Sequence, residues 1–98
     1  MKNIIALKIL RDFYEKYPDS EPSLLYWIQA TKRAEWNKPS DVIADFPTAD
    51  IIKNDRVIFN ISGNKYRLVV SINYTTKYVY IRFIGTHKQY DSIDVHTI

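Results

Sequence analysis

The sequence predicts an α+β fold in which N-terminal helices pack on one face of a small antiparallel β-sheet. Two observations support this prediction. In the first half of the chain, apolar residues recur at steps of three and four, which is the spacing of one helix face. In the second half, β-branched and aromatic runs alternate with short turn sequences, as in consecutive hairpins. A chain of 98 residues has room for one hydrophobic core, so we expect a single domain over residues 1–98.

The first half contains two expected helices and one short helical turn. The first helix covers residues 4–17 with a regular apolar face, and Pro18 stops it. The second begins at Ser20, which suits an N-cap, and continues to residue 34 or 35. The sequence around Pro39 breaks this pattern, and a helical turn follows over residues 41–45.

The second half contains three expected strands, at residues 56–61, 65–73 and 78–84. The first two are separated by Ser62-Gly63-Asn64, because Gly and Asn tolerate the positive φ of a tight hairpin turn. Residues 75–77 form the second turn, and Gly85 ends the third strand. Consecutive hairpins of this kind predict an antiparallel sheet.

Alternation along the second and third strands predicts two unlike sheet faces, since successive side chains point to opposite sides. The expected core face is apolar and consists of Tyr66, Leu68, Val70, Ile72, Val79, Ile81 and Phe83. The expected opposite face carries Lys65, Arg67, Val69, Ser71, Asn73, Tyr78, Tyr80, Arg82 and Ile84. With His87, Lys88 and Tyr90 at its edge, this second face would form a basic, aromatic-rich surface.

These residues also have structural explanations. Lys65 and Lys77 suit any solvated sheet face. Arg67 and Arg82 lie between apolar neighbours on adjacent strands, so the pair suits either a phosphate or buried structural partners. His87 follows a strand and suits a cap, although an imidazole is also the side chain best placed to move protons near neutral pH.

Composition narrows the function classes. The chain has no cysteine, which excludes disulfides and thiolate metal sites. Asp91 and Asp94 are too few to indicate a metal site, and no phosphate-binding loop or serine-hydrolase motif is present, so we expect no metal and no cofactor. The early apolar stretch IIALKIL is too short to span a membrane, so we expect a soluble cytoplasmic protein. A formal charge of +3 permits a polyanionic partner.

The run NISGNKYRLVVSINYTTKYVYIRFIGTHKQYDSID resembles the core of the HigB family of toxins from bacterial type II toxin–antitoxin systems. These toxins are part of the RelE-like group of messenger-RNA interferases. The matching elements are the GNKYRLVV strand, the VYIRFIGTH strand and the THKQYD segment that follows it. With the preceding WNKPSDV and FPTAD stretches, the resemblance extends from about residue 36 to residue 94.

This resemblance implies a RelE-like toxin fold and a metal-independent endoribonuclease that cuts mRNA, often on the translating ribosome, and so inhibits translation. It also implies a cognate HigA-like helix-turn-helix antitoxin, which represses the shared operon. The matching positions of this chain are Lys65, Arg67, Arg82, His87, Lys88 and Tyr90. Catalytic residues vary among RelE-like toxins, so the resemblance indicates the location of the site more firmly than each residue's role.

Cleavage of RNA by its own 2′-hydroxyl needs a base, an acid and cations for the developing charge. His87 is expected to be the base or the acid, while Arg67 and Arg82 hold the scissile phosphate. Lys88 adds positive charge, and Tyr90 donates a proton or stacks on a base. The product would be a 2′,3′-cyclic phosphate or its hydrolysed 3′-phosphate.

Three further residues complete the set of expected RNA contacts, namely Lys65, Lys77 and Tyr80. Two other function classes use the same basic face. A non-catalytic RNA-binding module would bind RNA in a salt-dependent way without cutting it. A protein-interaction domain would dock an acidic partner and would bind no RNA.

Overall fold

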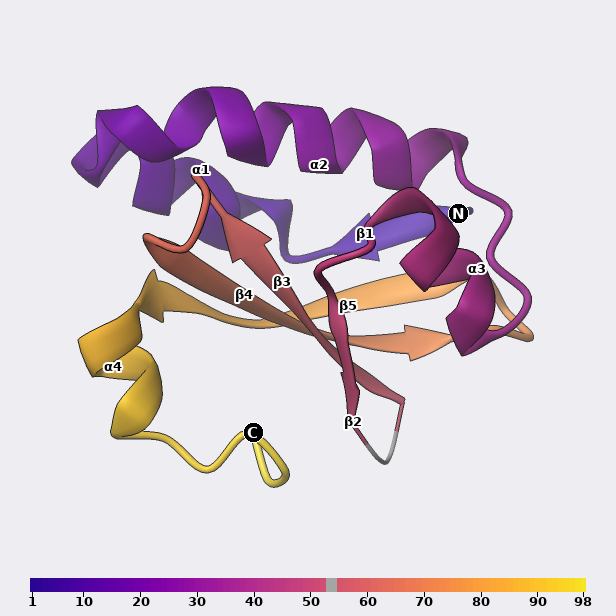
Figure 1. The fold of residues 1–98 in the computed structure, drawn as a ribbon. Helices are drawn as coiled ribbons and strands as arrows, with labels where there is room; N and C mark the ends of the chain where they lie inside the picture. The colour runs from indigo at the N-terminus through magenta and orange to yellow at the C-terminus, as the bar shows by residue number, and fades with distance from the viewer. Residues whose placement is uncertain (53–54) are drawn as a thin grey trace.

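The computed structural model describes residues 1–52 and 55–98, and the predicted α+β class is confirmed (Figure 1). The helices are α1 (Leu7–Lys16), the 3₁₀ turn η1 (Pro18–Ser20), α2 (Glu21–Arg33), α3 (Pro39–Asp45) and α4 (His87–Asp91). The strands are β1 (Asn3–Ile5), β2 (Asp50–Ile52), β3 (Arg56–Ile61), β4 (Tyr66–Asn73) and β5 (Tyr78–Thr86).

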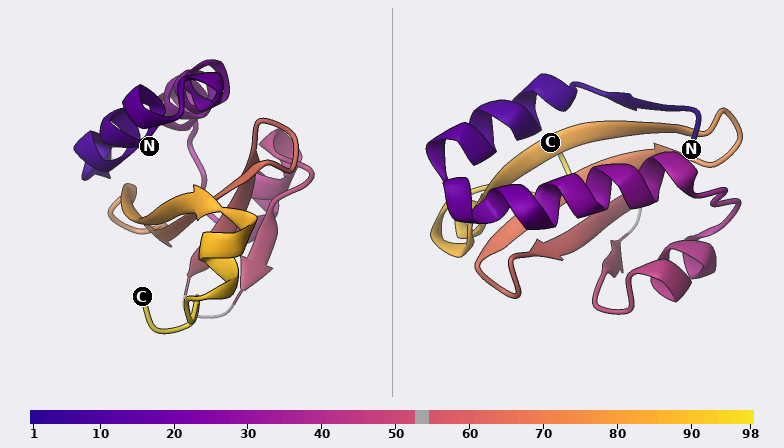
Figure 2. Two further views of the ribbon diagram at one scale, coloured as in Figure 1. Left: turned by 90° about the vertical axis from the view of Figure 1, so that its left-hand side faces the viewer. Right: turned by 90° about the horizontal axis from the view of Figure 1, so that it is seen from above.

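Within the described residues, the strands form one sheet in the order β1-β5-β4-β3-β2. β3 and β4 pair antiparallel, as do β4 and β5, which confirms the hairpin pattern, and β2 adds an antiparallel strand beside β3. β1 is the exception, since it runs parallel to β5 along the sheet edge. The views in Figure 2 show the strong twist of this sheet beneath the two long helices.

Helices α1 and α2 cover one face of the sheet, whereas α4 lies on the other side of it, at one end (Figures 1 and 2). The core between the layers contains Leu10, Leu24 and Trp27 from the helices and Phe59 from β3, all essentially inaccessible to solvent. Trp27 packs edge-on against Phe59, with ring centroids 5.4 Å apart. Burial of each leucine stabilises the fold by roughly 1.5–3 kcal/mol.

The start of the chain differs from the prediction, because residues 3–5 form a strand rather than the first turn of a helix. Ile4 pairs with Val79 of β5 and is buried in the core. Ala6 then adopts a left-handed conformation, with φ of 73°, which turns the chain from β1 into α1. The helical spacing of apolar residues therefore does not extend back to Ile4. The unpaired edge of β5 binds this segment as a short strand instead.

Most other predicted boundaries are confirmed to within a few residues. Ser20 does precede α2, but its hydroxyl donates to the carbonyl of Tyr17 at 2.7 Å and does not cap α2. The predicted turn at residues 41–45 is a helix that begins at Pro39. β5 continues through Gly85 to Thr86, so Gly85 does not end the strand. The sequence predicted neither β2 nor α4.

A β-bulge corrects the predicted strand faces. Val69 pairs with Phe83 but Val70 pairs with Ile81, so Arg82 is an extra residue on β5. The bulge reverses the alternation beyond Arg82. Ile84 therefore packs against the core, while Phe83 faces the side away from α1 and α2, which is the reverse of the prediction for both.

Candidate functional site

The THKQYD segment forms α4, and two reciprocal hydrogen bonds fix where this helix starts. The amide of Gln89 donates to the hydroxyl of Thr86 at 3.1 Å. The amide of Thr86 donates to the side-chain oxygen of Gln89 at 2.9 Å. This capping box satisfies two backbone donors at the start of a five-residue helix, which has little stability of its own. It thereby determines how His87 and Tyr90 are presented.

Gly85 allows α4 to lie close to β5. A Cβ atom at this position would lie 2.6 Å from the side-chain oxygen of Gln89 and 2.6 Å from Cζ of Phe83. Both distances are shorter than any normal contact, so a larger residue would displace the capping glutamine or the phenylalanine ring. Glycine is therefore required here for space rather than for a special backbone conformation.

Arg67 lies on the sheet face opposite α1 and α2, which we call the outer face and define by Arg67, Val69, Ser71, Tyr80 and Phe83. Its guanidinium carbon lies 4.9 Å from the centroid of the Tyr90 ring. The Tyr90 ring in turn lies 6.4 Å from that of Phe83. Nε of Arg67 is buried without a hydrogen-bond partner in the described part of the chain. An arginine held by a ring keeps its positive charge and its donors for another ligand.

Arg82 also lies on the outer face, but its side chain has different partners from that of Arg67. Its Nε donates to the hydroxyl of Ser71 at 2.9 Å, and its guanidinium lies 5.5 Å from the Tyr80 ring centroid. Arg82 lies at the bulge of β5 beside Val69 and Val70, on the same face as Arg67. The two arginines therefore share a face as predicted, and their joint contact with one phosphate stays a prediction.

His87 and Lys88 begin α4 and line a different surface. They face a groove between η1 and α4, of about 800 Å³, which Tyr17, Lys65 and Tyr66 also line. Nε2 of His87 is buried and has no hydrogen-bond partner among residues 1–52 and 55–98. The ring of His87 lines the groove, but a ligand would reach this buried nitrogen only after the side chain rotates. Lys88 is exposed at the rim.

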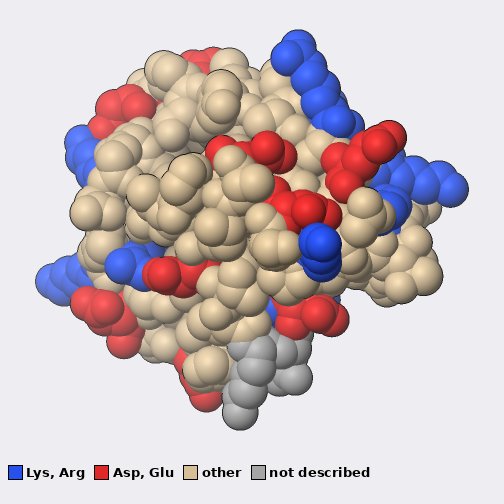
Figure 3. Space-filling view, turned by 45° about the vertical axis from the view of Figure 1, so that its right-hand side comes forward, with Lys and Arg blue, Asp and Glu red and all other residues tan. Residues whose placement is uncertain are grey.

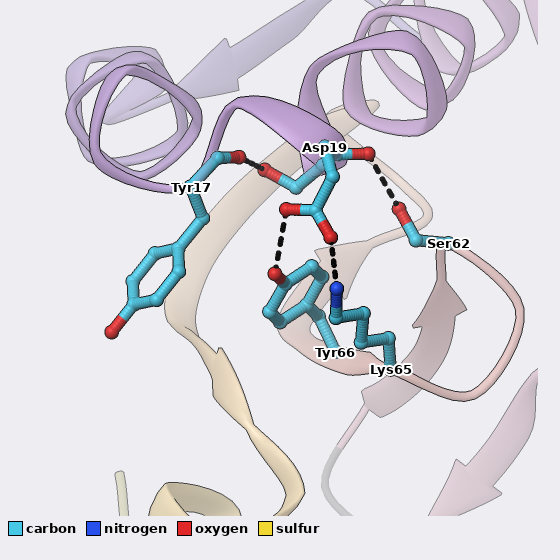
Figure 4. Close-up of polar contacts among 6 residues, drawn as sticks. Tyr17, Asp19, Ser62, Lys65 and Tyr66 are labelled. Carbon is cyan, nitrogen blue, oxygen red and sulfur yellow. Dashed lines mark hydrogen bonds and ion pairs between the residues drawn. The ribbon is translucent and has the colours of Figure 1, made fainter.

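Lys65 does not lie on the outer face with Arg67, contrary to the prediction. It precedes β4 and forms an ion pair with Asp19 of η1, while the Tyr66 hydroxyl donates to the same carboxylate at 2.7 Å (Figure 4). The hydrogen bond from Lys65 lowers the pKa of Asp19, and the hydrogen bond to Asp19 raises the pKa of Lys65. The same carboxylate raises the pKa of Tyr66. Lys65 is therefore engaged by Asp19 in an exposed ion pair on the helix side of the sheet.

The remaining two candidates lie apart from α4. Tyr80 is on the outer face beneath Arg82. Lys77 precedes β5, at the opposite end of that strand from His87, and donates to the carbonyl of Trp36 at 3.0 Å and to the side chain of Asn37. Basic and acidic side chains are interspersed on the face shown in Figure 3, so no continuous positive surface covers it. Lys77 lies apart from the α4 site, and its contact with RNA stays a prediction.

Comparison with known proteins identifies the family. Residues 20–93 match the model of HigB_toxin, described as the RelE-like toxic component of a toxin-antitoxin system. The chain belongs to the HigB toxin family. It is 33% identical over 91 residues to the mRNA interferase toxin HigB of Escherichia coli K12, a match that covers 91% of this chain and 88% of that protein. Identity to the mRNA interferase HigB of Escherichia coli O6:H1 is 25% over 93 residues, covering 93% of this chain and 90% of that protein.

The HigB family match includes every candidate site residue, since all of them lie between residues 65 and 90. Residues outside the prediction also contribute to the site, notably Asp19, Phe83 and Gln89. The spacing of Thr86 and Gln89 is a capping-box signature and could have revealed α4. Asp19 has no such signal, because it meets Lys65 across 46 positions of sequence.

Residues 1–52 and 55–98 carry neither a metal cluster nor a membrane-spanning helix. No three or more His, Cys, Asp or Glu side chains in this part of the chain are grouped as a metal site would require. No described helix of this HigB family chain has both the length and the apolar character needed to cross a bilayer.

Proposed function

We propose that this HigB family toxin is an endoribonuclease that cleaves mRNA in the cytoplasm, acting on translating ribosomes, and so inhibits translation. Its relatives in two Escherichia coli strains are named mRNA interferases. The observation that carries the proposal is the state of Arg67, whose guanidinium is held on the ring of Tyr90 beside α4 and forms no ion pair with any described residue. Such an arginine is preorganised for a phosphate.

In the proposed reaction, the 2′-hydroxyl of the RNA attacks the adjacent phosphate and the 5′-oxygen of the next nucleotide leaves. Arg67 binds the phosphate and stabilises the charge that grows on it. His87, the first residue of α4, acts as the base that takes the proton of the 2′-hydroxyl, after its ring rotates to expose Nε2. Tyr90 donates the proton that the leaving 5′-oxygen accepts, and Lys88 adds positive charge from the rim. The product carries a 2′,3′-cyclic phosphate.

Arg82 has a revised role in this proposal. Since its guanidinium is already engaged by Ser71 and Tyr80, it contacts RNA beside Tyr80 rather than acting on the scissile phosphate. Tyr80 offers its ring beside it as a stacking surface. Loss of Arg82 should therefore weaken RNA binding more than it slows the chemical step.

The proposed partner is a HigA-like helix-turn-helix antitoxin, as expected for the toxic component of a toxin–antitoxin pair. The exposed cations beside α4 offer an electrostatic target for an acidic segment of such a partner. Neutral variants at Arg67 should then associate more slowly with the antitoxin at low salt, whereas unchanged association rates would indicate binding elsewhere, for example on α1 and α2.

Expression and cleavage assays test the function directly. Induction of the wild-type chain in bacteria should arrest growth, and the purified protein should cut mRNA on translating ribosomes in a magnesium buffer. The fragments should end in 2′,3′-cyclic phosphate, and a mock purification should show no cleavage. RNA binding without cleavage would support a non-catalytic RNA-binding module, and neither binding nor cleavage would support a protein-interaction domain.

A further inference from the structure

The η1–α4 groove has the composition of a nucleotide site. One wall is aromatic, with Tyr17 stacked on Phe13 at 4.6 Å between ring centroids and Tyr66 at 5.7 Å from Tyr17. Pro18 extends this wall. A groove of about 800 Å³ lies in the size range of sites that hold small ligands.

The aromatic wall is rigid before any ligand binds. Tyr66 is buried, and its hydroxyl is fixed by Asp19. Asp19 is itself held in place, because its backbone carbonyl accepts a hydrogen bond from Ser62 at 3.2 Å (Figure 4). Rings that are already ordered lose little conformational entropy when a flat ligand stacks on them.

The rim of the groove supplies unneutralised positive charge. Lys16 and Lys88 both line the groove, and neither forms an ion pair with any described residue. Nζ of Lys16 lies 5.7 Å from the Tyr17 ring centroid, so a cation and an aromatic surface are adjacent. Lys65, by contrast, is already paired with Asp19. Aromatic walls under a cationic rim match the chemistry of a nucleotide, with its flat base and its charged phosphate.

The groove adjoins the proposed cleavage site. His87 lines the groove at the first position of α4, and Tyr90 on the same helix holds Arg67 on the outer face. An RNA strand that places its scissile phosphate at Arg67 therefore has a neighbouring nucleotide within reach of the groove.

We propose that the η1–α4 groove is a subsite for a nucleotide that flanks the scissile phosphate, with the base packed on Tyr17 and the phosphate bound by Lys16 and Lys88. This proposal rests on the proposed RNA cleavage. It assigns a role to η1 and to the end of α1, neither of which carries any of the residues proposed for the chemistry.

Tyr17→Leu and Lys16→Ala test the subsite. Leucine keeps an apolar side chain against Phe13 but removes the stacking ring, and Tyr17→Phe restores the ring. Tyr26→Leu is the matched aromatic control, because Tyr26 is 66% exposed on α2 and does not line the groove. Lys32→Ala is the matched lysine control, because Lys16 and Lys32 occupy the last turns of α1 and α2.

The readout is the rate of mRNA cleavage on ribosomes as a function of toxin concentration. For Tyr17→Leu and Lys16→Ala, the concentration at half-maximal rate should rise about tenfold, while the maximal rate changes little. Tyr17→Phe and both controls should behave as wild type. Binding to ribosomes without mRNA should be unchanged for every variant, and circular dichroism melting should show that each one is folded.

Other results would overturn the proposal. If the wild type cleaves mRNA but both groove variants match it, the groove is not a nucleotide subsite, although the proposed function stands. If the groove variants instead lose affinity for the antitoxin or for mRNA-free ribosomes, the groove binds another macromolecule. If the wild type itself fails to cut mRNA, the proposed function fails and the subsite fails with it.

Discussion

The groove beside η1 and the outer face of the sheet hold their cations in different ways. Lys65 in the groove is paired with the carboxylate of Asp19, whereas Arg67 on the outer face rests on the ring of Tyr90. The two residues are separated by one position in sequence, yet only the arginine keeps an uncompensated charge. A cation that is paired with a carboxylate stabilises the fold and is less available to a ligand. A cation that rests on an aromatic ring is held in place but can still bind an anion.

Apart from substitutions at Arg67, His87→Gln should have the largest effect on mRNA cleavage. His87→Gln keeps much of the shape of the side chain but cannot titrate, so mRNA cleavage should fall by about two to four orders of magnitude. The pH–rate profile should also lose the limb that an imidazole produces near neutral pH. Rates measured across pH for both proteins provide the test, with Tyr90→Phe and Lys88→Ala expected to cost less.

The opposite order of effects among these three variants would assign the proton transfer to another residue. If His87→Gln keeps a normal rate and an unchanged pH profile while Tyr90→Phe or Lys88→Ala abolishes cleavage, His87 is structural. Loss of cleavage in Tyr90→Phe would assign the chemistry to the outer face, where Tyr90 holds Arg67, whereas loss in Lys88→Ala would assign it to the groove.

Gly85→Ala should have an intermediate effect. The added methyl group would overlap Cζ of Phe83 and the side-chain oxygen of Gln89, so the capping glutamine must move and the start of α4 loses its cap. We expect a loss of stability of about 1–3 kcal/mol and a drop in cleavage of roughly tenfold, since His87 and Tyr90 are then held less firmly. Thermal melting and cleavage rates measure the two effects. Gly63→Ala is the comparison for activity, because its φ of +68° strains an alanine and lowers stability while no atom of α4 lies near it. Wild-type activity in Gly85→Ala would show that the exact position of α4 is unimportant.

Asp19→Asn should have the smallest effect on cleavage and a pH-dependent effect on stability. The hydrogen bond from Lys65 lowers the pKa of Asp19 below its ordinary value of 3.8. The stabilisation is therefore complete above that value and is lost as the pH falls through the lowered folded-state pKa. The melting temperatures of wild type and Asp19→Asn should differ near neutral pH and converge in strong acid. A difference that persists at the lowest pH would mean that the Asp19 charge is not the source.

The elements that the sequence predicted well are those with local patterns. The spacing of apolar residues in α2 and the turn at Gly63 are both contained within a few neighbouring positions. β1 was missed because a three-residue strand has no pattern of its own and depends on an edge of β5 more than 70 positions away, as the pairing of Ile4 with Val79 shows.

The candidate site was predicted in part for the same reason. The position of α4 beside Arg67 agrees with the expected surface, because the alternation of β4 is regular up to Val69. The faces of Phe83 and Ile84 were wrong because the bulge at Arg82 exists only in the pairing of two strands. The ion pair of Lys65 was missed because its partner Asp19 lies on a distant 3₁₀ turn.

The contrast between Arg67 and Lys65 can be measured directly as the ratio of two cleavage rates. Arg67→Ala should reduce the rate of mRNA cleavage by about two to four orders of magnitude, while Lys65→Ala should change it by less than about fivefold, both at nearly wild-type melting temperatures. Arg67→Lys should remain well below wild type, because an ammonium cannot replace the planar guanidinium. Equal losses in Arg67→Ala and Lys65→Ala, or a folded Arg67→Ala variant with wild-type activity, would contradict the assignment of the phosphate to the outer face.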